Sequence, residues 1–255
     1  HGGFEADSAN GHSGTINVTT TGATGINFAS GNSSESFSQL GHGGLRADGD
    51  HSGEINVDSQ GGGIRFASGS DNPNTFWIAY SQLGHGGYEA RGNRSGTIDV
   101  DAAGDIEFDA SLGGRREYVH LGHGGFDSDA ANGAEDASDN GDIFVNTTNG
   151  GNLLFKASDR VANGGTPQDS ADGNSGRESY AHLGHGGYNS SGNQVGDITV
   201  GIDGTIDFLG GKHDQSYALL GHGGTSAKGA NSGAISVTAN GIDATDGFGI
   251  RFQSG

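Results

Sequence analysis

Hydrophobic residues occur along this chain in short runs of alternate positions, and three kinds of run follow one another in a fixed order. The first run reads Gly-x-Ile-x-Val, the second reads Ile or Leu, any residue, then Phe, and the third places an aromatic residue three positions before Leu. Ile16/Val18, Ile26/Phe28 and Phe37/Leu40 are the first set. Alternation of β-branched and aromatic residues between Gly, Asn and Asp predicts short strands. No window of helical length carries an apolar stripe, so we expect almost no helix.

The sequence Leu-Gly-His-Gly-Gly separates successive sets of runs. It is complete at Leu40–Gly44, Leu83–Gly87, Leu121–Gly125, Leu183–Gly187 and Leu220–Gly224, and His1-Gly2-Gly3 opens the chain. Counted from each histidine, the repeats are 1–41, 42–84, 85–122, 123–184, 185–221 and 222–255. Periods in this range are typical of stacked architectures, in which a unit buries its apolar face only against its neighbours. We therefore predict a single all-β array, and expect it to be part of a longer repeat protein.

The predicted architecture is a right-handed parallel β-helix, because crossover connections between parallel strands strongly favour that hand. Two coil lengths remain open. If each repeat forms two coils, equivalent residues recur at about 9.6 Å, and if it forms one they recur at about 4.8 Å. We favour two coils per repeat, because a narrow interior needs few large side chains.

Composition alone would suggest a disordered chain, since only 31% of the residues are hydrophobic and the formal net charge is −19. The regular placement of the apolar residues argues against disorder. Glycine occurs 53 times and proline twice, which fits many tight turns between strands whose amides must pair.

The residue counts exclude several classes of function. The chain contains no cysteine, which excludes disulfides and zinc–thiolate sites, and no apolar stretch reaches membrane-spanning length. Acidic residues number 31 against 12 Lys and Arg, so nucleic acids and anionic membranes are poor partners. Cations are the plausible small partners.

The repeated histidine supports two hypotheses. We favour a structural ladder of stacked rings that hydrogen-bond to the backbone. The alternative is a site for a transition metal or haem, since neutral imidazole is a common ligand for both. The five residues concerned are His42, His85, His123, His185 and His222, whereas His12, His51, His120, His182 and His213 follow no regular spacing.

Acidic residues in Gly/Asn/Asp-rich stretches offer a second candidate site, for Ca²⁺, which takes six to eight oxygen ligands. The candidates are Asp127, Asp129, Asp136, Asp139 and Asp142, with Asp48 and Asp50 as a smaller pair. They match neither the EF-hand loop nor the Gly-Gly-x-Gly-x-Asp repeat, and we favour solvated acidic turns over a Ca²⁺ site. No cofactor is predicted beyond this Ca²⁺ hypothesis.

Variable segments interrupt the repeats at the same junctions and predict loops that leave one edge of a constant stack. They are Ser68–Phe76, Asp127–Asn140, Ser158–Ser179 and Thr238–Phe248. No repeat is enriched in convergent charged residues, and no Gly-x-Ser-x-Gly nucleophile motif occurs. We predict no catalytic residue and no enzymatic activity.

Short Gly-Asp-Ile-x-Val and Gly-x-Ile-x-Phe strands alternating with Tyr-x-x-Leu-Gly-His-Gly-Gly resemble the repeat regions of large filamentous-haemagglutinin-like bacterial exoproteins. The clearest stretches are Ser179–Phe208 and Ser216–Val237. The resemblance implies a right-handed parallel β-helix, exported by a two-partner or autotransporter-like route, with a role as an adhesin, matrix component or filament stalk.

Together these observations predict a non-enzymatic structural or adhesive protein located outside the cell or on a bacterial surface. Its expected partners are ligands of the cell surface or matrix, neighbouring repeats of the same chain, and further copies that extend it into filaments. A single long chain and an end-to-end polymer both remain open. The alternative function is a binding module for Ca²⁺, a transition metal or haem.

Overall fold

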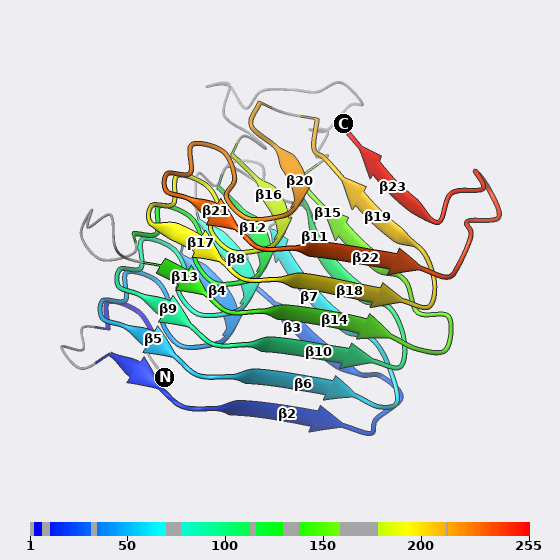
Figure 1. Cartoon of the computed structure of the whole chain (residues 1–255), viewed down its shortest axis with the longest axis horizontal. Coiled ribbons are helices and arrows are strands. Elements are labelled where there is room, and N and C mark those ends of the chain that lie inside the picture. Colours follow the sequence, from blue (N-terminus) through cyan, green and yellow to red (C-terminus); the bar gives the residue numbers. More distant parts are fainter. Residues whose placement is uncertain are drawn as a thin grey trace.

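The chain folds into a parallel β-helix, in which each of the first five repeats adds one strand to each of four parallel sheets and the sixth repeat adds one to three of them (Figure 1). The computed structural model describes residues 3–6, 11–31, 35–69, 78–112, 116–129, 138–158, 178–212 and 214–255. Within these ranges the chain forms strands and turns and no helix. It follows that the described residues include no helix able to cross a membrane.

The four sheets are named here in the order in which the chain first enters them. The first sheet contains β1 (His12–Ser13), β5 (His51–Ser52), β9 (Arg94–Ser95), β13 (Ser138–Asn140), β17 (Asn193–Val195) and β21 (Asn231–Ser232). The second contains β2 (Ile16–Thr20), β6 (Ile55–Ser59), β10 (Ile98–Ala102), β14 (Ile143–Thr147), β18 (Ile198–Ile202) and β22 (Ile235–Ala239). The third contains β3 (Ile26–Ala29), β7 (Ile64–Gly69), β11 (Ile106–Leu112), β15 (Leu153–Lys156), β19 (Ile206–Leu209) and β23 (Ile250–Gln253). The fourth contains β4 (Ser36–Leu40), β8 (Ala79–Leu83), β12 (Tyr118–Leu121), β16 (Tyr180–Leu183) and β20 (Tyr217–Leu220).

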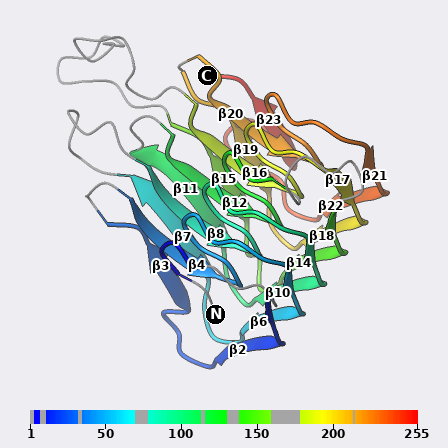
Figure 2. The same ribbon diagram turned by 90° about the vertical axis from the view of Figure 1, so that its left-hand side faces the viewer.

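Equivalent residues of successive repeats are direct neighbours in every sheet. In the second sheet Ile16 pairs with Ile55, which pairs with Ile98, and the same column continues to the last repeat. Each repeat is therefore one coil of four strands, and our preference for two coils per repeat is wrong. Figure 2, seen at right angles to Figure 1, shows the coils in succession from β2 at one end to β22 and β23 at the other.

The two-coil expectation failed because it treated the large apolar residues as the whole interior. The coil is wider than that, since polar, aromatic and histidine side chains also fill columns inside it. Gln82, His85 and Arg94 are all fully buried although none of them belongs to the apolar runs.

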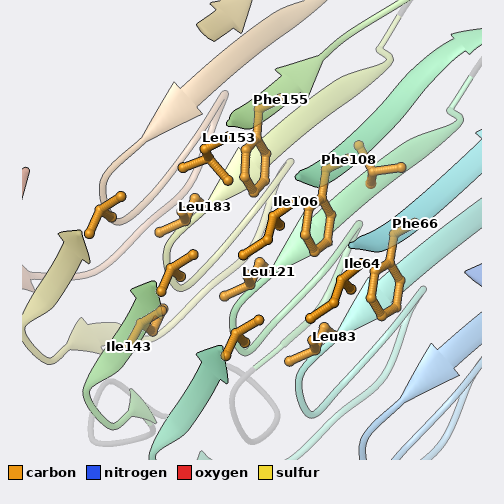
Figure 3. Packing of buried hydrophobic residues seen from close by; sticks show 14 of the residues in the cluster. Ile64, Phe66, Leu83, Ile106, Phe108, Leu121, Ile143, Leu153, Phe155 and Leu183 are labelled. Carbon is orange, nitrogen blue, oxygen red and sulfur yellow. The ribbon is translucent and has the colours of Figure 1, made fainter. Parts of the chain in front are cut away.

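The main hydrophobic core lies between the second, third and fourth sheets. The alternate residues of β6, β10 and β18 are buried, as their period-two pattern predicted. Ile and Val of the second sheet pack with Ile and Phe of the third and Leu of the fourth. Figure 3 shows Ile64 and Phe66 of the third sheet beside Leu83 of the fourth. The Phe rings stack in one column with centroids 4.5 to 5.0 Å apart. Burying one such side chain contributes roughly 1.5–3 kcal/mol.

A second, aromatic cluster packs behind the fourth sheet. It joins Tyr80, Tyr118 and Tyr180 to the residues that follow each His-Gly-Gly, such as Tyr88 and Phe126. The column that runs from Phe37 to Tyr217 has ring centroids 4.8 to 5.3 Å apart. The aromatic–x–x–Leu run therefore serves both cores, because its aromatic residue packs into one and its Leu into the other.

Candidate functional site

The Leu-Gly-His-Gly-Gly segment forms the turn that connects the fourth sheet to the next coil. Its central glycines form a column of parallel bridges from Gly43 through Gly86 to Gly223. A Cβ on Gly43 would lie 2.3 Å from the carbonyl oxygen of Gly86 in the next coil. A Cβ on Gly87 would lie 2.3 Å from the carbonyl oxygen of Gly44 in the previous coil and 2.8 Å from the Tyr80 hydroxyl. The motif therefore needs glycine because neighbouring coils approach at these positions.

The histidines of this turn stack in a continuous column inside the coil. Their ring centroids are 4.7 to 5.0 Å apart and their planes are nearly parallel. The spacing corresponds to one strand-to-strand distance, in agreement with one coil per repeat. The members of the column are His42, His85, His123, His185 and His222.

The rings of His85, His123, His185 and His222 each hydrogen-bond to the backbone at two different places. The backbone N–H of His42 donates to Nδ1 of His85 at 2.9 Å, and the same bond links every later pair. On the opposite side of the ring, Nε2 lies 2.8 Å from the carbonyl oxygen of Gly53 for His85, with equivalent contacts for the other four. A nitrogen that accepts an N–H cannot itself carry a proton, so these partners assign the neutral Nε2–H tautomer.

This arrangement bears directly on the metal hypothesis. In His85, His123 and His185 one ring nitrogen accepts a backbone N–H and the other donates to a carbonyl. A metal ion needs an unshared nitrogen lone pair from each of several ligands that converge within about 2.3 Å of it. Stacked parallel rings direct their nitrogens side by side rather than toward one point. The geometry has the features of a structural ladder.

Burial keeps these imidazoles neutral. Desolvation lowers the pKa of His85 to about 4 and that of His185 to about 3. The pKa of His123, at the middle of the column, also falls well below its usual value for the same reason. At neutral pH these rings therefore carry no charge, as their hydrogen bonds to the backbone require.

The histidines that looked irregular in the sequence belong to two further interior columns. His120 and His182 stack with centroids 4.8 Å apart, at the fourth-sheet position that Gln39 and Gln82 occupy in earlier coils. The expectation of irregularity is therefore wrong for these residues. Gln82 Nε2 donates to the carbonyl of Gly124, and His120 Nε2 lies 2.7 Å from that of Gly184. His213 lies outside the described residues.

The other column follows the first sheet and is polar throughout. His12 stacks on His51 with centroids 5.3 Å apart, and the column continues in register through Arg94, Asp139, Gln194 and Asn231. His51 is fully buried and desolvation lowers its pKa to about 3.

A buried ion pair lies at the centre of this polar column. Arg94 Nη1 donates to Asp139 Oδ1 at 3.0 Å, and both side chains are completely inaccessible. Arg94 Nη2 also donates to the carbonyl oxygens of Ala90 at 2.5 Å and Asp129 at 3.2 Å. Burial raises the pKa of Asp139 and the adjacent guanidinium opposes that rise. Sequence reasoning missed this pair, although each residue stands four positions before the first Ile of its strand run.

The structure does not bring the acidic Ca²⁺ candidates together. Asp127 accepts a bond from Asn189 Nδ2 at 2.7 Å, Asp129 from Ser191 Oγ at 2.9 Å, and Asp142 from the backbone N–H of Asp197 at 2.9 Å. Asp139 is occupied by Arg94, and Asp136 lies outside the described residues. Among the residues that the structure describes, no group of three or more His, Cys, Asp or Glu side chains could hold a metal ion.

The bond of Asp142 to the backbone of Asp197 is one of several such bonds on the outside of the turns. Asp50 Oδ1 accepts the backbone N–H of Asn93 at 2.9 Å, and Asp197 Oδ1 accepts that of Ala234 at 2.7 Å. In each case a carboxylate of one coil binds the backbone of the next coil. Acidic residues in these turns thus connect successive coils.

No family model, no curated protein and no solved structure matches this chain. The likeness to filamentous-haemagglutinin-like repeats therefore depends on the repeat motif alone and stays a prediction.

Proposed function

We propose that this chain is a structural segment of an extracellular stalk, filament or adhesin, that it acts mechanically, and that it catalyses no reaction. One observation carries the proposal: the same residue positions stack in register from the first coil to the last in every sheet. A β-helix built in this way behaves as a rod, because each coil contacts only its neighbours and the stack can be lengthened without changing its cross-section.

Its interior supports a mechanical role because it combines several independent contacts at each coil boundary. Backbone bonds of four sheets cross each boundary between the first five coils, and so do the Phe, Tyr and His columns. The histidine column adds a backbone-to-ring bond, such as that from His85 to His123, where the tight turn leaves the regular sheets. Unstacking one coil would break all of these contacts at once.

The outer surface also supports a rod whose coils adhere to each other although the chain is strongly acidic. Arg46 lies between acidic residues of other coils, 2.9 Å from Glu89 and 3.0 Å from Glu35. Arg251 contacts Asp207 of the coil below at 2.7 Å. Exposed pairs of this kind stabilise little individually, but they remove like-charge repulsion within the columns. The remaining negative charge disfavours lateral aggregation.

We assign contacts with other molecules to the variable segments that interrupt the repeats, rather than to the regular stack of coils. Of these, the segment of the sixth repeat is described, and it exposes Ile242 and Phe248. The proposed partners are ligands on cell surfaces or in an extracellular matrix, reached through export of the protein from a bacterium.

A mechanical measurement tests the proposal. The chain is held at both ends and stretched in single-molecule force spectroscopy, and a rod of this construction is expected to unfold in steps that each release one repeat. Unfolding as one unit without steps, or extension without measurable resistance, would contradict the proposal.

Elemental analysis, combined with thermal melts with and without EDTA, separates the rod from the binding module. For a rod we expect no stoichiometric metal and an unchanged melting temperature. A bound metal whose removal lowers that temperature would overturn the assignment of the histidines and carboxylates to structure.

A further inference from the structure

Asparagine followed directly by glycine occurs six times in the chain, and the structure describes both residues at three of these pairs. The backbone nitrogen that follows an asparagine can attack the side-chain amide, and glycine favours this reaction because it has no side chain in the way. The attacking N–H must first leave its hydrogen-bond acceptor. The three described pairs, Asn140-Gly141, Asn149-Gly150 and Asn240-Gly241, differ in what that acceptor is.

In two of the pairs the glycine N–H takes part in the backbone bonding between coils. Gly141 N–H donates to the carbonyl oxygen of Val195 at 3.0 Å, and Gly241 N–H donates to that of Gly204 at 2.9 Å. Attack by either nitrogen would first require neighbouring coils to separate locally. The fold therefore protects these two pairs.

The third pair forms a tight turn on the surface between β14 and β15. Asn149 and Gly150 have φ angles of +53° and +76°, and Gly151 N–H donates to the carbonyl oxygen of Thr148 at 3.0 Å. Positive φ at both central residues is the feature of a type I′ turn, for which Asn-Gly is a preferred sequence. Both residues are exposed, and a Cβ on Gly150 would meet no atom within 4 Å. The turn therefore leaves space around the reacting atoms and gives water access to them.

The Gly150 N–H donates to a carboxylate instead of a backbone carbonyl. Its acceptor is Oδ2 of Asp203 in the next coil, at 2.7 Å. The N–H of Asp203 donates in turn to the Thr147 hydroxyl of the previous coil at 3.0 Å, which holds Asp203 against this turn. A carboxylate at hydrogen-bond distance from a nucleophile can accept its proton during attack, as a general base.

We propose that Asn149 is a deamidation site of the folded chain and that Asp203 is its general base. The Gly150 nitrogen forms a bond to Cγ of Asn149 while its proton passes to the Asp203 carboxylate. The bond between Cγ and the side-chain nitrogen then breaks, and ammonia leaves with that proton. Water opens the resulting cyclic succinimide to aspartate or isoaspartate at position 149. The net reaction converts one amide and one water into one carboxylic acid and one ammonia.

This modification goes beyond the proposed function, because it acts on the contact between the fourth and fifth coils. Either product places a new carboxylate near that of Asp203, and like charges at short distance repel. Isoaspartate also adds one carbon to the backbone of a turn that has only two central residues. Both changes weaken the bond that Asp203 now accepts from Gly150.

Timed incubation of the intact 255-residue chain at pH 7.5, followed by peptide mass spectrometry, tests the proposal. Deamidation replaces an amide NH₂ with a hydroxyl, and fragmentation of the peptides assigns the gain in mass to one asparagine. We expect Asn149 to react at least about tenfold faster than Asn140 or Asn240, because the nitrogens that follow those two must first leave the bonding between coils. Equal rates at the three sites, or a slower reaction at Asn149, would overturn the proposal.

Two variants of equal charge change test the role of Asp203. Asp203→Gln removes the carboxylate at Gly150 and should slow the reaction at Asn149 at least about fivefold. Asp105→Asn removes a carboxylate from the other side of the same turn, where Oδ1 accepts the Asn152 N–H at 2.8 Å, and should leave the rate within about twofold. An unchanged or faster reaction in Asp203→Gln, or equal slowing in both variants, would overturn the assignment of the general base. The rates at the two protected pairs report any loosening of the fold in either variant.

Discussion

From His85 to His222, each histidine of the repeated turn fills two backbone hydrogen-bonding positions with one ring, and it can do so only while it is neutral. Protonation of Nδ1 in His123 would place two N–H groups against each other, at the bond that His85 N–H now donates. It would also bring charge within 4.7 Å of the next ring, centroid to centroid. Aromatic residues in the same turn would keep the stacking but lose the bonds. At the scale of the residue, burial and hydrogen bonding together explain why a titratable group occupies the interior.

This neutrality predicts a loss of stability in acid. The buried histidines have folded-state pKa values below the usual 6.5, with His85 and His182 at about 4. The unfolded chain therefore binds more protons, so the stabilisation is complete above about pH 6.5 and is lost as the pH falls toward 4. For a group such as His85 the loss is on the order of 3 kcal/mol. Urea unfolding between pH 7.5 and pH 4 measures it.

The chain supplies its own control for this prediction. Glutamine occupies the register position of His120 and His182 in earlier coils, and Gln82 Nε2 donates to the equivalent carbonyl, that of Gly122, at 3.4 Å. The double variant His120→Gln/His182→Gln should keep its stability at pH 7.5 within about 1 kcal/mol and lose less of it by pH 4. An unchanged loss in acid would show that other groups cause it.

The buried ion pair gives a second prediction at this scale. Asp139→Ala leaves Arg94 charged and unpaired in the interior, and should lower the free energy of unfolding by about 3–5 kcal/mol in urea melts. The matched control is Asp58→Ala on the outside of β6, which should change it by less than about 0.5 kcal/mol. Replacing both partners, as Arg94→Met/Asp139→Leu, should recover most of the loss. A small effect of Asp139→Ala would contradict the role of the pair.

At the scale of the element, the turn is more demanding than the strands it connects. The strands tolerate Ile or Leu, and Phe or Tyr, at their buried positions, as in the column of Leu153 and Ile206. The turn accepts only glycine where coils approach, because its φ angles are positive and its Cβ positions are occupied by neighbouring backbone. Because every described turn of this kind has the same shape, it also fixes the register of the strands on both sides.

We therefore expect Gly87→Ala to destabilise the fold by more than about 2 kcal/mol. Its φ is +131°, and a Cβ would meet the Gly44 carbonyl oxygen at 2.3 Å. Gly22→Ala is the control, since its nearest contact would be the Thr20 hydroxyl at 3.5 Å. Thermal melts of the two variants should differ clearly, and similar melts would show that the turn can relax.

At the scale of the whole molecule, stability is a sum over coils and their boundaries. Among the described strands, the main contacts join elements of the same coil or of adjacent coils, so stability does not depend on one central core shared by all coils. Removing one complete repeat should therefore leave a shorter rod, whereas disturbing the register inside one strand should damage the boundaries on both sides.

Deletion of residues 185–221 tests this property. It joins Gly184 to His222 and places Ile235 on Ile143 and Phe252 on Phe155, so every apolar column continues. We expect a folded chain of lower stability by circular dichroism and hydrogen exchange. Deleting Thr199 alone shifts half of β18 by one residue, turns its side chains to the opposite face and should cost more than the loss of the whole repeat. The opposite order would contradict a modular stack.

The sequence by itself determined the strands and the columns. Period-two alternation in runs such as Ile55–Ser59 fixes which side chains point inward, and their recurrence in every repeat fixes which residues are equivalent. These properties are local, because backbone conformation and side-chain direction depend on neighbouring residues. Parallel stacking followed from them, since equivalent residues can form columns only if the coils run in the same direction.

Only the tertiary structure decided the distance along the sequence over which the chain completes one coil. That distance made each repeat one coil and placed Arg94 against Asp139, which are 45 positions apart in the sequence. It also decided the state of the histidines, because the backbone groups that hold His85 neutral belong to other coils. The equal spacing of Arg94 from Ile98 and of Asp139 from Ile143 marks them as equivalent positions, but only the length of the coil makes equivalent positions direct neighbours. These contacts arise when the coil closes and equivalent residues of different repeats come into contact.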